Sequence, residues 1–185
     1  MEAAIYCPGP SLDWALAQPR RDSRLTIAVN RAAERVVADY WAMLDPVTWE
    51  ITGRLASSPA VVCAPSCWRE LVARQPEAEA LGWAFPDAKL AESLAPLARW
   101  RTKSMTVAMV LAATLGAKRI DLWGVDLEGE ADFDGRSYGC QRRDPARWTA
   151  ERSLLNQVAR NLADHAVPVR RITPGGIEDW VESSC

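Results

Sequence analysis

The chain has 185 residues, of which 49% are hydrophobic, so it is long enough for one domain with a substantial core and short for two. Its formal net charge of −2 provides no general attraction to nucleic acid or to an acidic membrane, and no apolar run is long enough to cross a bilayer. The five cysteines are odd in number and scattered, which argues against a disulfide framework and favours a reduced, cytoplasmic protein with no membrane partner.

Short apolar runs alternate with helical patterns along the first half of the chain. We expect strands at 3–7, 25–29, 40–44 and 60–64, and helices at 12–17, 31–37 and 67–74. Ser11 and Ser66 stand where the first and third of these helices need an N-cap. The pattern predicts strands separated by short helices.

The second half continues the alternation. The almost wholly apolar segment 102–115 predicts a long helix, with Gly116 in the position of a C-terminal cap glycine. A buried strand at 120–125, a helix at 147–165, a strand at 167–172 and a short helix at 177–181 follow. We therefore expect a single α/β domain over residues 1–185, Rossmann-like, with a mostly parallel sheet covered by helices on both faces.

Turn and polar residues follow four of the predicted strands. Gly9-Pro10-Ser11 comes after the first, Asn30 after the second, Asp45 after the third, and Asp126 after the strand at 120–125. Because ligands bind beyond the carboxyl ends of parallel strands, these residues are expected to meet in one pocket.

The chemistry of these positions suits a nucleotide. A glycine between prolines lets a ligand approach the backbone, and the helix that follows points N–H groups at a phosphate, although an ordinary strand-to-helix turn explains the same residues. Asn30 suits a base edge or a ribose hydroxyl, and Asp45 a ribose hydroxyl or a base amino group, while both are also common turn residues.

Charged residues offer two further features. Asp126 suits a metal ion, a hydroxyl group or the role of a base, and the loop after it carries Glu128, Glu130, Asp132 and Asp134, which can hold Mg²⁺ or simply be solvated. Arg101, Lys103 and Ser104 open the long helix, where arginine suits a phosphate. A basic stretch, either solvated or in contact with an anionic ligand, contains Arg136, Arg142, Arg143 and Arg147.

Taken in order, these motifs resemble the bacterial sialyltransferases of Campylobacter type and their distant relatives, the motility accessory factors and the archaeal hydroxymethylpterin diphosphokinases. Proteins of this pattern also occur in phages and prophages. The resemblance is carried by Gly9-Pro10-Ser11-Leu12, Asn30, Asp45-Pro46, Arg101 with Ser104, and the run Ile120–Asp126, and it covers most of residues 1–127.

The resemblance implies that Gly9, Pro10, Ser11, Asn30, Asp45, Ser104 and Asp126 line one nucleotide pocket, and that Arg101 lies near the reaction centre. The chain departs from the family in other respects. The family's catalytic histidine has no counterpart, since His165 lies in another segment, and its two tyrosines have no clear partners. We therefore transfer the fold and the pocket, but not sialyl transfer.

Three functions follow from this reasoning. The leading one is a glycosyltransferase-like transferase that uses a nucleotide or nucleotide-sugar donor without metal. Asp126 or Asp134 would be its base, and Arg101, with Arg142 or Arg143, would stabilise the leaving phosphate. The second is an ATP-dependent diphosphokinase with Mg²⁺ on Asp126, and the third a non-catalytic nucleotide-binding or assembly protein. The acceptor, for which nucleic acid stays open, and the oligomeric state are not indicated by the sequence.

Overall fold

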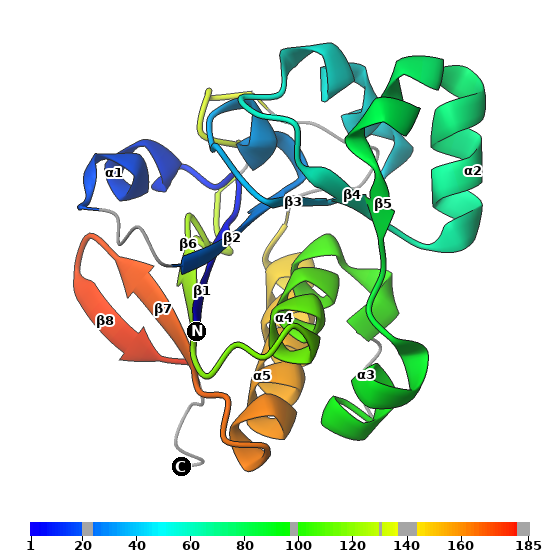
Figure 1. Cartoon of the computed structure of the whole chain (residues 1–185). Helices are drawn as coiled ribbons and strands as arrows, with labels where there is room; N and C mark the ends of the chain where they lie inside the picture. Colours follow the sequence, from blue (N-terminus) through cyan, green and yellow to red (C-terminus); the bar gives the residue numbers. More distant parts are fainter. Residues whose placement is uncertain (20–23, 97–99, 130, 137–143, 181–185) are drawn as a thin grey trace.

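The computed structural model describes residues 1–19, 24–96, 100–129, 131–136 and 144–180. In this part of the chain, eight strands form one sheet in the order β5-β4-β3-β2-β1-β6-β7-β8 (Figure 1). Their bounds are β1 (Glu2–Tyr6), β2 (Arg24–Val29), β3 (Tyr40–Ala42), β4 (Ala60–Val62), β5 (Trp83–Ala84), β6 (Ile120–Trp123), β7 (Val169–Thr173) and β8 (Gly176–Asp179). All neighbours are parallel except β7 and β8, which are antiparallel.

Helices cover both faces of this sheet (Figure 1). One face carries α3 (Ala88–Leu94), α4 (Ser104–Thr114) and α5 (Pro145–Asp164), and the other carries α1 (Leu12–Ala17) and α2 (Pro65–Arg74). Four 3₁₀ segments complete the described elements: Asn30–Glu34, Pro46–Arg54, Pro76–Leu81 and Trp100–Thr102. The predicted α/β architecture with helices on both faces is confirmed.

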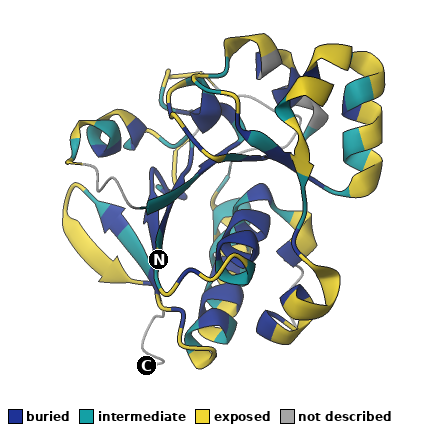
Figure 2. Ribbon diagram, viewed as in Figure 1, coloured by how far each residue is buried: buried dark blue, intermediate teal, exposed yellow. Residues whose placement is uncertain are grey.

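The core consists of two layers because successive strand residues point to opposite faces. Ile5 of β1 packs in the layer beneath α4 and α5, whereas Ala4 and Tyr6 pack in the layer beneath α1. Helix α4 is buried along most of its length, since it lies between the sheet and the helices α3 and α5 (Figure 2). Its almost wholly apolar sequence therefore reflects contact on several sides.

The structure corrects several sequence predictions. The segment predicted as a helix at 177–181 forms strand β8 instead; the turn Pro174-Gly175 reverses the chain, so that Thr173 pairs with Gly176, and Val181 lies outside the described residues. The predicted helix at 31–37 is a 3₁₀ segment, and the helix expected at 67–74 begins at Pro65, with Ala64 rather than Ser66 as its N-cap. Strand β5 and helix α3 were not predicted from the sequence.

The strand order creates a crevice between β1 and β6. From β1 the chain moves outward through β2, β3, β4 and β5, then returns through α4 to place β6 on the other side of β1. At such a reversal, the loops beyond the two neighbouring strands leave in opposite directions and open a space at the carboxyl edge.

Candidate functional site

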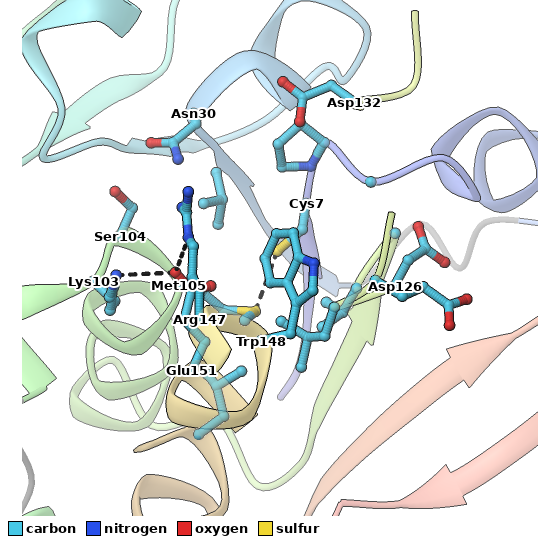
Figure 3. Close-up of a pocket in the computed structure, with 18 of the residues that line it drawn as sticks. Cys7, Asn30, Lys103, Ser104, Met105, Asp126, Asp132, Arg147, Trp148 and Glu151 are labelled. Atoms are coloured by element: carbon cyan, nitrogen blue, oxygen red, sulfur yellow. Dashed lines mark hydrogen bonds and ion pairs between the residues drawn. The ribbon is translucent and has the colours of Figure 1, made fainter. Parts of the chain in front are cut away.

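A cavity of about 370 Å³ opens at this crevice (Figure 3). Its walls come from the segments that follow β1, β2, β3 and β6, from the first turn of α4, and from the first turns of α5. This size is at the lower end of the range for small-molecule sites in proteins.

The structure brings six of the nine predicted site residues together around this cavity. They are Gly9, Pro10, Asn30, Asp45, Ser104 and Asp126. Three others, Ser11, Arg101 and Asp134, do not line it. What these residues bind remains a prediction.

The Gly-Pro turn is held by the protein's own carboxylate. Asp126 Oδ2 accepts a hydrogen bond from the backbone N–H of Ser11 at 2.9 Å, and the N–H of Gly9 donates to the carbonyl of Gly124 at 3.0 Å. A Cβ on Gly9 would overlap both the Asp126 carboxylate and the Gly124 carbonyl, so glycine is needed here for close approach. The turn was predicted as a phosphate cradle, but its amides are already bonded and α1 has only six residues.

Asn30 presents an amide to the cavity. Its backbone φ of 48° lies in the left-handed region, and the Trp41 indole N–H donates to its backbone carbonyl oxygen at 2.9 Å. Within the described residues, the buried side-chain oxygen Oδ1 has no hydrogen-bond partner. A buried amide oxygen without a partner is costly, which makes this atom a natural acceptor for a ligand donor.

Ser104 connects the start of α4 to the loop after β3. Its side chain is buried, and its Oγ accepts a hydrogen bond from the backbone N–H of Leu44 at 3.0 Å. The hydroxyl hydrogen is thereby left for another acceptor. The carbonyl of Asp45 accepts from the backbone and side chain of Thr48, at 2.9 and 2.6 Å, which fixes the turn that carries Asp45 to the cavity.

Two cations face the cavity and share one carboxylate. Lys103 Nζ lies 2.9 Å from Glu151 Oε1, and Arg147 Nε lies 3.0 Å from the same oxygen (Figure 3). The sequence marked Lys103 at a helix start and Arg147 in a basic stretch, but neither as a site residue. Nothing in the sequence pointed to Glu151 as a site residue, because its contact with Lys103 depends on how α5 packs against α4.

Trp148 lies in the middle of the cavity residues, in front of Cys7 (Figure 3). Its Nε1 donates to the carbonyl of Gly129 at 3.2 Å, and the Arg147 guanidinium carbon lies 5.2 Å from the centre of the indole ring. These contacts hold a large aromatic surface at the cavity, and such a surface suits stacking against a nucleobase.

Cys7 is an unreactive part of the wall. Burial, together with the nearby charges of Asp126 and Glu151, raises the pKa of its thiol far above the ordinary value. The thiol contacts the Met105 sulfur at 3.4 Å. Because a nucleophilic cysteine must be a thiolate, Cys7 contributes packing rather than covalent chemistry.

The acidic loop is tied to the protein body. Arg31 Nη1 lies 3.0 Å from Asp134 Oδ2, and the backbone N–H of Phe133 donates to the carbonyl of Pro8 at 2.8 Å. Asp134 therefore points to Arg31 instead of the cavity, whereas Asp132 is buried in the cavity wall. Glu130, by contrast, lies outside the described residues.

Arg101 is directed away from the cavity. Its Nη2 lies 2.9 Å from Glu92 Oε1, and its guanidinium stacks on the Trp100 ring at 4.9 Å. Neighbouring side chains of the 3₁₀ segment Trp100–Thr102 point in different directions. The Trp100 side chain is buried in the core, and that of Arg101 is exposed. Arg142 and Arg143, predicted to assist Arg101, lie outside the described residues.

Among the residues that the structure describes, carboxylates outnumber cations around the cavity. The lining includes Asp45, Asp126, Glu128, Asp132 and Glu151, against Lys103 and Arg147. Among the described residues, no group of three or more histidine, cysteine, aspartate or glutamate side chains is arranged to hold a metal ion. In that same part of the chain, no helix is both long and apolar enough to cross a membrane.

Comparison with known proteins shows a shared architecture. No protein-family model and no curated protein sequence matches the chain. Among solved structures, it is similar to the sialyltransferase CstII from Campylobacter jejuni in complex with the substrate analogue CMP-3FNeuAc, with a TM-score of 0.50 and 12% identity over 100% of this chain and 88% of that chain. What the two proteins share is the fold.

A second solved structure is more distant. Thiamine pyrophosphokinase from Bacillus subtilis aligns with a TM-score of 0.41 and 10% identity, covering 94% of this chain but only 61% of that one. The similarity to the sialyltransferase shows the fold alone, and neither similarity assigns a residue a role.

Proposed function

We propose that this chain is a transferase that binds a nucleotide-activated donor in the cavity between β1 and β6, with chemistry of the glycosyltransferase type. The observation that carries the proposal is the convergence of two kinds of group on one cavity. The Asn30 amide and the Ser104 hydroxyl can read a nucleoside, and Lys103 with Arg147 can bind a phosphate.

The phosphate is assigned to the start of α4 rather than to the Gly-Pro turn. Lys103 precedes the first turn of this eleven-residue helix, and Arg147 shares its counter-ion Glu151. Two cations and the positive end of a helix dipole together favour an anion. Trp148, also at this cavity, offers a face for the base or the sugar.

The excess of carboxylates over cations among the described lining residues favours a ligand with few negative charges. A donor joined to one phosphate places a single anion beside Lys103 and Arg147 and offers hydroxyl groups to the remaining carboxylates. A triphosphate would face repulsion from the same carboxylates unless a divalent cation accompanied it. A nucleoside-monophosphate donor is therefore the preferred class, and the CMP analogue in the structurally similar sialyltransferase supports this choice.

The transfer step can be written with residues of this chain. An acceptor hydroxyl oxygen forms a bond to the donor carbon, and the bond between that carbon and the phosphate oxygen breaks, with its electron pair leaving on the phosphate. Lys103 and Arg147 stabilise the departing phosphate in place of Arg101. Asp126 is the candidate base for the acceptor proton, because one of its oxygens holds Ser11 and the other remains for substrate.

A diphosphokinase is the second candidate, and the observation that favours it is that Asp126 lines the cavity together with Glu128 and Asp132 of the acidic loop, which can share a magnesium ion with a ligand. Magnesium bound by Asp126 and by ligand phosphates would offset the charge of a triphosphate. The variant Asp126→Asn keeps the shape of the side chain and removes its charge. If nucleotide binding requires Mg²⁺ in the wild type and no longer responds to Mg²⁺ in this variant, the diphosphokinase replaces the glycosyltransferase-like function.

Thermal-shift screening tests the proposal. Nucleoside monophosphates, diphosphates and triphosphates and common nucleotide sugars would each be added with and without Mg²⁺. We expect monophosphate-linked ligands to raise the unfolding midpoint without Mg²⁺. A response confined to triphosphates with Mg²⁺ would favour the diphosphokinase, and no response to any of them would favour a non-catalytic assembly protein.

A further inference from the structure

Glu151 contacts two cations of the cavity with the same oxygen atom. Its Oε1 lies 2.9 Å from Lys103 Nζ and 3.0 Å from Arg147 Nε (Figure 3). All three side chains line the cavity and are partly buried, with Glu151 only 14% exposed. The two nitrogens are therefore held close together around one carboxylate at the wall of the ligand space.

This carboxylate positions the two cations. Arg147 lies one turn before Glu151 on α5, whereas Lys103 precedes the first turn of α4, so Glu151 connects the starts of two helices. Two positive charges at such close range repel each other, and each long side chain loses rotational freedom when it is fixed. The negative charge of Glu151 offsets both costs and fixes the groups that are available to a phosphate.

A phosphate can bind Lys103 without displacing Glu151. An ammonium group has three N–H donors, and Glu151 accepts one of them from Lys103. The carboxylate then stays beside the bound phosphate, and partial burial weakens the screening of its charge by salt. The ligand thus meets two positive charges and one negative charge from these three residues.

The two phosphate forms of a transfer reaction differ in charge. The phosphodiester of a nucleotide-sugar donor carries one negative charge. The free nucleotide left after transfer carries a phosphate monoester, which holds nearly two negative charges at slightly alkaline pH because its second pKa is about 6. Glu151 repels each of these charges, so it opposes the monoester more strongly than the diester.

We propose that Glu151 is a specificity-determining residue of the donor site: it holds Lys103 beside Arg147 and offsets one of their two charges, so that the site favours the phosphodiester of a donor over the phosphate monoester of the spent nucleotide. The donor is held before transfer, and the nucleotide is released after it. This inference rests on the proposed function, because it takes the ligand of the cavity to be a nucleotide.

Calorimetric titration with matched ligands tests the role of Glu151. The probes are the 5′-monophosphates of adenosine, cytidine, guanosine and uridine and their methyl phosphodiesters, at slightly alkaline pH and without metal. The wild type should bind the diester more tightly than the monoester. Glu151→Gln keeps the shape and the acceptor oxygen but removes the charge, so monoester affinity should rise about tenfold while diester affinity rises much less.

Two further variants separate charge from structure. Glu70→Gln is the matched control, since Glu70 also pairs with an arginine four residues away, Arg74, but on α2 and outside the cavity lining; both affinities should stay as in the wild type. The double variant Arg147→Gln/Glu151→Gln removes one charge of each sign. Both ligands should bind it more weakly, and the ratio of their affinities should return toward the wild-type ratio.

The possible outcomes distinguish this inference from the proposed function. If Glu151→Gln changes both affinities by the same factor, Glu151 is a structural residue, and the inference fails although the nucleotide site stands. A wild type that prefers the monoester would overturn the proposed selectivity in the same way. If neither class of ligand binds to the wild type or to Glu151→Gln, the proposed function is contradicted and the inference falls with it.

The wild type alone provides a second measurement that does not depend on the folding of a variant. Between slightly alkaline pH and a pH of about 5 the monoester gains a proton and becomes singly charged, whereas the diester keeps its charge. Monoester affinity should therefore approach diester affinity as the pH falls. The ratio of affinities is compared because the cavity's other carboxylates act on both ligands; these are Asp45, Asp126, Glu128 and Asp132. A ratio that does not change with pH would overturn the inference.

Discussion

Some residues at the site lower the stability of the ligand-free protein. Asn30 combines a left-handed backbone with a buried side-chain oxygen that has no partner among the described residues. Both features reduce stability, and groups of this kind tend to lie at binding sites. A ligand that donates a hydrogen bond to Oδ1 would remove one of these costs, which connects the local strain to the proposed function.

The variant Asn30→Gly separates the effect of the backbone conformation from the effect of the side-chain amide. Glycine adopts a φ of 48° readily, and the hydrogen bond from Trp41 goes to the backbone carbonyl and is retained. We expect the unfolding midpoint to stay the same or rise, while nucleotide affinity falls about tenfold because the amide is lost. A large fall in the midpoint, or unchanged affinity, would show that the amide is structural only.

Gly9 is expected to tolerate no side chain. A Cβ there would overlap the Asp126 carboxylate, so Gly9→Ala must displace the Gly-Pro turn or Asp126, and we expect it to lower the free energy of unfolding by about 2 kcal/mol. Gly53→Ala is the matched control, since a Cβ at Gly53 meets no atom within 4 Å. Chemical denaturation of both variants provides the comparison, and equal stability would contradict the described contact.

Sequence reasoning located the site residues that directly follow strands. Asn30, Asp45 and Asp126 could be placed together because the carboxyl ends of parallel strands share an edge. Trp148 and Glu151 could not, because their positions on α5 depend on how that helix packs. Arg101 and Asp134 carried suitable charges, but Arg101 pairs with Glu92, nine residues before it, and Asp134 pairs with the distant Arg31. Neither pairing has a pattern in the sequence.

At the scale of elements, Arg31 makes the ion pair that fastens the loop containing Asp132 and Asp134, while Arg35 contacts only the Phe133 ring of that loop. Arg31 pairs with Glu34 and Asp134, each at 3.0 Å, and its guanidinium lies 5.3 Å from the centre of the Phe133 ring. This arrangement holds the loop over the Gly-Pro turn and places Asp132 in the cavity wall. A planar guanidinium makes these contacts at once, whereas an ammonium group cannot.

We therefore expect Arg31→Lys to loosen this loop. Hydrogen exchange of the Phe133 amide, which donates to Pro8, should be about tenfold faster than in the wild type. Arg54→Lys is the control, because Arg54 also pairs with Glu34 but its side chain is 58% exposed. If the Phe133 amide exchanges at the same rate in both variants, Arg31 does not fasten the loop.

The helices and strands differ in how well the sequence predicts them. The bounds of α1 and the cap glycine after α4 follow from local signals, namely the break before Leu12 and the glycine that ends the apolar run 102–115. In the structure Gly116 has a positive φ, as such a cap requires. Strand β8 does not, because a segment of four residues is too short to separate the periods of a helix and a strand. Its identity comes from pairing with β7, which the turn at Pro174-Gly175 permits.

For the molecule as a whole, the order of the strands determines where the site lies. Alternating β and α patterns predict a parallel sheet, but they do not reveal that β6 lies beside β1 and not beyond β5. That placement opens the crevice at the carboxyl edge and brings the start of α4 and the start of α5 to it. The sialyltransferase has a similar fold.

Calorimetric titration of nucleoside monophosphates and their sugar conjugates, in the absence of metal, tests the central claim most directly. We predict saturable binding of one ligand per chain, weakened at least about tenfold in Arg147→Gln because a charged contact to phosphate is lost. The same titration of Arg160→Gln, an exposed position on the same helix, should match the wild type. Absence of binding at millimolar concentration, or equal affinity of the wild type and Arg147→Gln, would contradict a nucleotide site in this cavity.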